Sequence, residues 1–80
     1  MENIEFSANY DGKHCEFTLK NGKKSGVISK FFSDQPNIYQ LVETGDMHEF
    51  KEADEKNEKN KMKKLCNPIN LADIVSVMPL

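Results

Sequence analysis

The fold is decided by residues 15–32, which read CEFTLKNGKKSGVISKFF. Every second residue of 15–19 is apolar, and a period of two points alternate side chains to one face of a β-strand. Asn21-Gly22 interrupts this alternation, and the pair is a strong hairpin signal because both residues tolerate positive φ. The stretch therefore predicts two antiparallel strands, the second over 26–32.

Gly26 lies at the start of this second strand. A glycine inside a strand pattern marks a bulge or sharp bend, and such bends curl a sheet into a barrel. We therefore expect a barrel. Phe31 and Phe32 are consecutive, so one ring should face the core and the other should face outward.

Apolar residues also alternate over 4–10, where Ile4, Phe6, Ala8 and Tyr10 would share one face of a strand. Asp11-Gly12 then supplies turn chemistry. We expect this segment to be the first of three strands in a meander.

Two further strands are predicted later in the chain. Residues 33–37 are rich in turn formers, and 38–43 follows them as a strand. Residues 74–78 are β-branched enough for a last strand, with Pro79 at or beyond a sheet edge. Together the segments predict a mainly β domain over 1–80, an SH3-like (Sm-like), partly open five-stranded barrel.

Residues 46–65 predict a charged helical insertion before the last strand. Asp46 suits the N-cap, with Glu49 as its capping partner three residues later. Carboxylates crowd the first half of the segment and lysines its end, as the helix macrodipole favours. Polar residues interrupt the apolar stripe, so we expect residues 55–61 to lift off the barrel or fray, and deletion of 55–60 to leave the barrel folded.

The composition restricts the partners and the compartment. The net charge is −2, from 13 acidic and 11 basic residues, so the chain has no long-range attraction for a polyanion. No stretch approaches the roughly 20 apolar residues that span a bilayer. The first residues are acidic where a secretory signal would be basic, so we expect a cytoplasmic protein that binds no membrane.

Cys15 and Cys66 are the two cysteines of the chain. We interpret them as reduced, packed thiols; the alternative is one disulfide, which would stabilise the fold by about 4 kcal/mol. With His14 and His48 they offer a two-histidine, two-cysteine set for zinc. Adjacent residues on a strand point to opposite faces, so His14 and Cys15 would not reach one ion. We therefore expect no metal or cofactor.

The chain offers no catalytic constellation either. A nucleophilic thiolate needs a base and an orienting group beside it, whereas Cys15 shares the apolar face of its strand. Glycine-rich phosphate loops are absent from the sequence. We expect a protein that is not an enzyme.

Lysines concentrate around the predicted hairpin. They are interpreted as solubilising residues that protect sheet edges, or alternatively as a phosphate-contacting patch with Phe31, Phe32 or Tyr39 as stacking platforms. Tyr39 beside the outward phenylalanine would also form a small peptide-binding groove, by analogy with other SH3-like barrels. The lysines are Lys13, Lys20, Lys23, Lys24 and Lys30.

Two segments resemble Sm-like proteins. Residues 17–31 are similar to their first motif, in which a strand, an Asn-Gly turn, a glycine in the bent next strand and an apolar pair recur. Residues 69–79 have the apolar rhythm of their second motif, ending in valine and proline. The resemblance implies a strongly bent five-stranded barrel, often closed into a ring that binds uridine-rich RNA.

The resemblance also implies candidate RNA-binding positions. The family places an aspartate and an asparagine near the RNA after the third strand, and Asp34 and Asn37 stand here, one residue closer together than in the family. Leu71-Ala72 stands where bacterial members carry a lysine and a histidine.

Two functions follow as hypotheses. The first is a non-enzymatic interaction module that binds a protein partner or itself. The alternative is an Sm-like RNA-binding protein. The candidate binding residues are Lys20, Lys23, Lys24, Lys30, Phe32, Asp34, Asn37 and Tyr39.

Overall fold

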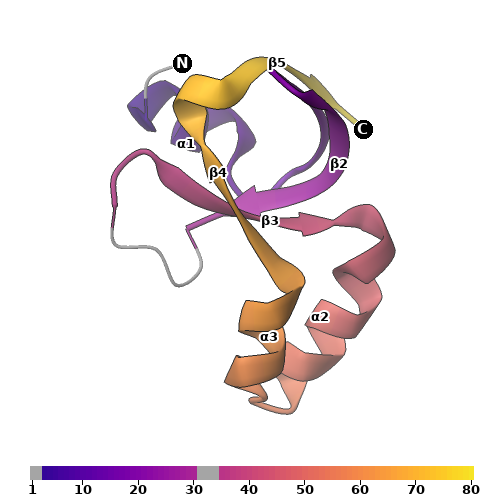
Figure 1. Cartoon of the computed structure of the whole chain (residues 1–80). Helices are drawn as coiled ribbons and strands as arrows, with labels where there is room; N and C mark the ends of the chain where they lie inside the picture. Colours follow the sequence, from indigo (N-terminus) through magenta and orange to yellow (C-terminus); the bar gives the residue numbers. More distant parts are fainter. Residues whose placement is uncertain (1–2, 31–34) are drawn as a thin grey trace.

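The computed structural model describes residues 3–30 and 35–80. It is mainly β, with five antiparallel strands in one sheet and a helical insertion (Figure 1). In chain order the elements are α1 (Asn3–Tyr10), β1 (His14–Leu19), β2 (Gly22–Ser29), β3 (Ile38–Glu43), the 3-10 helix η1 (Thr44–Asp46), α2 (Met47–Glu55), α3 (Lys59–Leu65), β4 (Cys66–Asn70), the 3-10 helix η2 (Leu71–Asp73) and β5 (Ile74–Pro79).

The strand order is β4-β3-β2-β1-β5, and the sheet does not close on itself. The last strand pairs with the first, with Phe17 opposite Val77, so both ends of the chain contribute to one curled sheet. This confirms a mainly β, open, five-stranded arrangement, although the five strands are not all those predicted. The strands predicted over 38–43 and 74–78 are confirmed.

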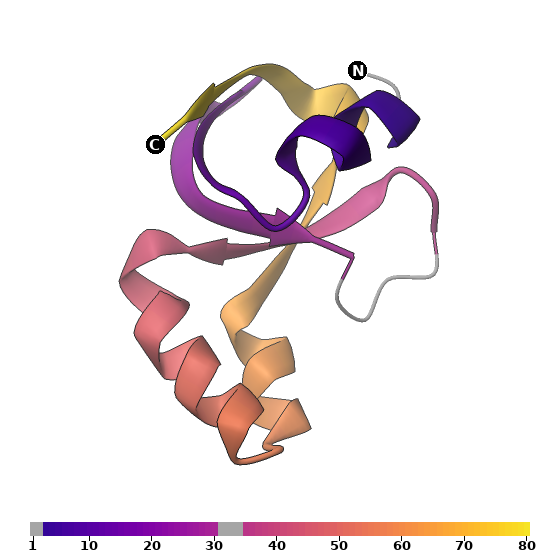
Figure 2. The ribbon, with the colours of Figure 1, turned by 180° about the vertical axis from the view of Figure 1, so that it is seen from behind.

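Residues 4–10 form helix α1, so the strand predicted there is wrong. Phe6 and Tyr10 are four residues apart, and a helix therefore also places them on one face, with ring centroids 5.6 Å apart. Alternation over so short a run does not distinguish the two structures. Gly12, with φ +77°, reverses the chain after the helix. Figure 2 shows α1 lying across one open end of the curled sheet.

The hairpin between β1 and β2 is confirmed, but its turn lies one position earlier than the Asn-Gly signal suggests. Leu19 pairs with Gly22, so Lys20 and Asn21 are the turn residues. β2 therefore begins at Gly22 and ends at Ser29, whereas the sequence predicted 26–32.

Gly26 allows β2 and β3 to approach closely. A Cβ at this position would lie 2.0 Å from the carbonyl oxygen of Val42, a distance that no side chain can occupy. The sequence predicted a bulge or sharp bend here, whereas the β1–β2 register runs through Gly26 without a shift. The glycine instead permits the close approach of β2 to β3, where it pairs with Glu43.

The core lies inside the curl and contains an aromatic cluster. Phe6 of α1 contacts the rings of Phe17 and Tyr39, at centroid distances of 6.5 and 4.9 Å, and all three side chains are fully buried. α1 thus supplies the side chain that closes the core, and the aromatic pairs stabilise the helix against the sheet.

The insertion is two antiparallel helices, not the single helix predicted over 46–65. Asn57 has φ +59°, and around it Glu58 donates to the carbonyl of Ala53 (2.8 Å) while Asn57 donates to that of Asp54 (3.1 Å). These two bonds are the Schellman motif that ends many helices. The break falls at Asn57, inside the 55–61 segment that was expected to lift off the barrel or fray.

The predicted cap at Asp46 is wrong. Its backbone is helical, and its side chain makes no capping hydrogen bond. η1 runs directly into α2, so the extended backbone that an N-cap residue needs never forms.

β4 was not predicted, and the insertion therefore precedes the last two strands rather than the last one. Pro68 and the polar residues around it hid this strand in the sequence. Proline is tolerated because β4 lies at the edge of the sheet, where its missing N–H interrupts no ladder.

Candidate functional site

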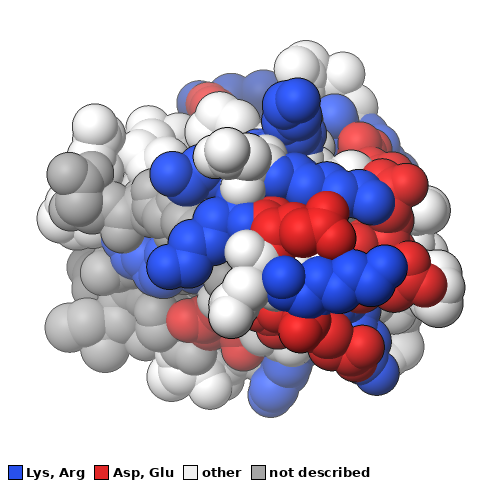
Figure 3. Space-filling model, turned by 90° about the horizontal axis from the view of Figure 1, so that it is seen from below, with Lys and Arg blue, Asp and Glu red and all other residues white. Residues whose placement is uncertain are grey.

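The lysines of the β1–β2 hairpin do not form a free cationic patch. Carboxylates face three of them, with Nζ–O distances of 3.8 to 3.9 Å; the pairs are Lys20–Asp73, Lys23–Glu16 and Lys24–Glu43. The pairs are exposed, so each adds little stability. They do balance the local charge. Figure 3 shows the same intermixing of basic and acidic side chains over the end formed by α2 and α3.

Lys30 binds the chain that follows β2. Its ammonium donates to the carbonyl oxygens of Gln35 and Pro36, the latter at 2.9 Å, and lies 4.9 Å from the centre of the Tyr39 ring. The charge is thus engaged by backbone carbonyls and a π face, which orders the entry to β3.

Tyr39 is fully buried, so its ring is not accessible to a nucleic-acid base or to a peptide. It packs against Phe6 in the core, with ring centroids 4.9 Å apart. Phe31, Phe32 and Asp34 lie outside the described residues.

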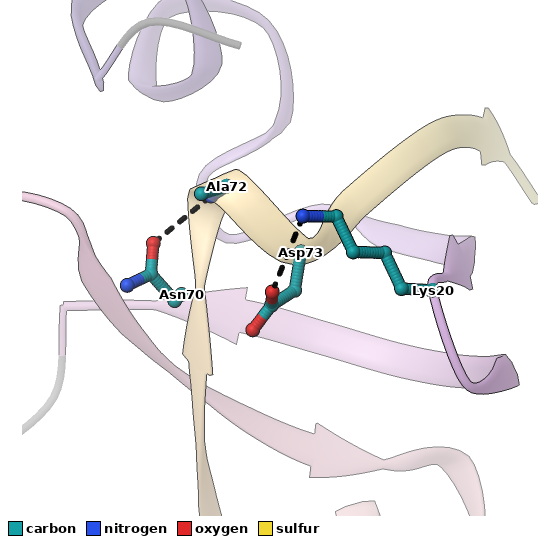
Figure 4. Close-up of polar contacts among 4 residues, drawn as sticks. All are labelled: Lys20, Asn70, Ala72 and Asp73. Carbon is teal, nitrogen blue, oxygen red and sulfur yellow. Dashed lines mark hydrogen bonds and ion pairs between the residues drawn. The ribbon is translucent and has the colours of Figure 1, made fainter.

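The structure brings Asn37 next to the corner formed by η2. The Leu71 N–H donates to the carbonyl oxygen of Asn37 (2.9 Å). Asn70 caps the corner, its Oδ1 accepting from the Ala72 N–H at 2.9 Å (Figure 4). Lys20 holds the far end of the corner, its N–H donating to the carbonyl of Asp73 (3.1 Å) and its ammonium pairing with the Asp73 carboxylate.

A groove of about 460 Å³ runs between the β1–β2 hairpin and β4, on the open side of the sheet. Its apolar residues come from both elements, and charged or amide side chains surround them. The sequence did not indicate this groove because it did not indicate β4. The lining residues are Leu19, Lys20, Asn21, Lys24, Asn67, Pro68, Ile69 and Asp73.

β5 is one edge of the sheet. The Leu80 N–H donates to the carbonyl of His14 (3.0 Å), and hydrogen-bonded and non-bonded pairs alternate along antiparallel strands. In the register of β5 with β1, the peptide groups of Val77 therefore point away from β1. Three apolar side chains along this segment are strongly exposed: Val75 (64%), Met78 (55%) and Leu80 (64%).

β4 is the other edge. The bond from Leu71 N–H to Asn37 continues the β3–β4 register, so Ile69 faces Tyr39 across hydrogen bonds. By the same alternation the peptide groups of Pro68 and Asn70 point away from β3. The β4 edge thus offers carbonyl acceptors at both positions and a donor only at Asn70, because proline carries none.

The cysteines and histidines are separated. Cys15 lies buried in the core, and Cys66 lies half-buried on β4; both are free thiols. His14 Nε2 lies 2.9 Å from the Thr44 hydroxyl, and His48 Nε2 lies 2.9 Å from Glu52. Across 3–30 and 35–80, no three His, Cys, Asp or Glu side chains come together in a way that could hold a metal ion.

Neither thiol is activated. Burial raises the pKa of Cys15, an effect that nearby Lys13 partly offsets, and burial also raises the pKa of Cys66. A raised pKa keeps the thiol protonated near neutral pH, and the protonated form is a poor nucleophile.

Comparison of the chain with protein-family models, with curated proteins and with solved structures found no match. Among the residues that the structure describes, no helix has the length and apolar character needed to cross a membrane.

Proposed function

We propose that this chain is an SH3-like barrel of the Sm-like type that acts as a non-enzymatic interaction module, and that its partner is a second copy of itself. The proposal rests on one observation: the sheet has two different open edges, and one of them carries exposed apolar side chains. The curled five-stranded sheet and the close approach at Gly26 support the choice of fold.

β5 has the properties of an edge that pairs with another strand. It contains no charged residue, whereas edges that remain single are commonly protected by lysine or other charges. The outward N–H and C=O of Val77 are available for a further ladder, and the side chains of Val75 and Met78 add apolar surface. Strand addition combines these two sources of affinity.

β4 is the complementary edge. It lines the groove beside the β1–β2 hairpin, where Leu19 and Ile69 supply apolar surface to receive side chains from β5 of the next copy. A contact between two different surfaces is heterologous, so repetition closes a ring or extends a filament.

Light scattering coupled to size-exclusion chromatography tests the proposal. The wild-type chain should elute as an oligomer, and Met78→Lys should shift it toward monomer by at least about tenfold in dissociation constant, because the interface would bury an unpaired charge. Asn60→Lys, which adds the same charge on exposed α3, is the control and should assemble like wild type. A wild-type monomer at all concentrations would refute self-association.

RNA binding by such an assembly is a second candidate. The observation that favours it is the hydrogen bond between Leu71 and Asn37, which puts two segments that the Sm-like resemblance associates with RNA side by side. Fluorescence anisotropy with a short uridine-rich RNA should show binding that weakens as salt is added. Asn37→Ala should reduce it, with Asn60→Ala as control; equal affinity for an adenosine-rich RNA would argue against this candidate.

A further inference from the structure

A second hollow lies between α2 and the outer face of the sheet, away from both edges. It has a volume of about 230 Å³. Val27 and Val42 line it from the sheet, and Met47, Phe50 and Lys51 line it from α2. Apart from the lysine, every residue that lines this cavity is apolar.

The cavity follows from how α2 covers the sheet. Leu41 points into the main core, so its neighbour Val42 points to the opposite face, toward the helices. Val42 is nonetheless buried, and it lines the cavity together with residues of α2. Met47 and Phe50 are only half-buried, and Val27, directly opposite Val42 on β2, is half-buried too. The small apolar face of α2 therefore leaves the space beside Val27 unfilled.

Lys51 brings a positive charge to this apolar space. Among residues 3–30 and 35–80, its side chain takes part in no ion pair or hydrogen bond. The basic residues of the hairpin differ in this respect, since carboxylates face them. A ligand that complements the cavity needs an apolar body and one negative charge.

We propose that this cavity binds a small apolar monocarboxylate, with its hydrocarbon part against Val27, Val42, Met47 and Phe50 and its carboxylate at the Lys51 ammonium. An enclosed apolar cavity of about 150 Å³ takes up benzene, and the volume of about 230 Å³ here has room for a phenyl ring with a short side chain. The site is independent of self-association, because none of its residues lies on β4 or β5.

Titration of the ¹⁵N-labelled chain with phenylacetate, followed by NMR, tests this assignment. Amide shifts should saturate and concentrate at the cavity residues. Acetate should not bind, because it lacks the apolar body. 2-Phenylethanol, which keeps the ring and loses the charge, should bind about two- to fivefold more weakly, the range expected for one exposed ion pair.

Variants locate the site. Val27→Phe should fill the cavity and weaken phenylacetate binding more than about tenfold, since the ring would lose its buried contacts. Met47→Phe serves the same purpose from α2 if the first variant does not fold. Lys51→Gln should reduce phenylacetate binding to the level of 2-phenylethanol, whereas Lys56→Gln, an equal change of charge beyond the end of α2, should leave it unchanged.

Three results would overturn the proposal: shifts scattered away from the cavity, phenylacetate binding that survives filling of the cavity in a folded variant, or equal affinity for the acid and the alcohol. None of these results depends on the oligomeric state, so the assembly proposal stands or falls separately.

Discussion

The curled sheet and the helical hairpin are built on different principles. The core of the sheet joins residues from almost the whole length of the chain, whereas in the hairpin α2 and α3 bury only Ala53 and Met62. Figure 2 shows the hairpin projecting from the sheet. The core cluster consists of Phe6, Cys15, Phe17, Leu19, Ile28, Tyr39, Leu41, Leu71 and Ile74.

The strands that lead into and out of the helical hairpin are paired with each other. Val42, near the end of β3, pairs with Cys66 at the start of β4, so the chain leaves the sheet and returns to it at paired positions. Sheet stability should therefore depend on contacts between distant segments, and the hairpin should behave as a tolerated insertion. Substitutions of the same kind in the sheet and in the helical hairpin should therefore differ in their effect on stability.

Phe6→Ala should have the largest effect. Removing a fully buried ring that contacts Phe17 and Tyr39 should lower the free energy of unfolding by about 3–5 kcal/mol. Phe50→Ala removes the same group from half-buried α2 and should cost less than half as much. Urea denaturation measures both; equal losses would mean that α1 is not part of the core.

Gly26→Ala should be next. The new methyl group would meet the Val42 carbonyl at 2.0 Å, so β2 and β3 must separate, at about 1–3 kcal/mol. Gly45→Ala is the matched control, because a Cβ there has nothing within 4 Å. It should be neutral or slightly stabilising. If thermal unfolding ranks the two variants in the reverse order, the close approach at Gly26 is incorrect.

Replacing residues 44–64 with Asn-Gly should remove the hairpin and keep the sheet. Glu43 and Leu65 would then flank a two-residue turn in the register that already pairs Val42 with Cys66. Exposure of Val42 should cost about 1.5 kcal/mol. Cooperative unfolding and unchanged amide shifts in β1 and β5 are the expected readouts, and loss of cooperativity would show that the helices are part of the core.

The sequence indicated strands where local pattern and final environment agree. Alternation over 15–19 and 38–43 matches strands that have one side in the core, and both were predicted. Residues 4–10 failed because Phe6 and Tyr10 suit a helix face as well as a strand face. β4 failed because its burial is slight and Pro68 is acceptable only at an edge.

The candidate site was less predictable, because its properties depend on contacts between segments that are distant in the chain. The lysines of the β1–β2 hairpin were visible in the sequence, but carboxylate partners such as Asp73 for Lys20 come from segments distant in the chain. Tyr39 carries an aromatic ring that could stack on a base if it were exposed, and only the tertiary structure shows that it is buried in the core. Open edges are a property of strand order, which no local pattern contains.

Asn57→Gly should have the smallest effect, and of opposite sign. Asn57 adopts φ +59° at the end of α2, a conformation that glycine accepts without the Cβ penalty, so the free energy of unfolding should rise by about 0.5–1 kcal/mol. Asn57→Ala should lower it by about 1 kcal/mol. Because the sheet core is distant from this turn, hydrogen exchange should report both changes in α2 and α3, with β1 and β2 unaffected. Equal changes in protection throughout the sheet would show that hairpin and sheet unfold as one unit, which would remove the distinction between the two regions.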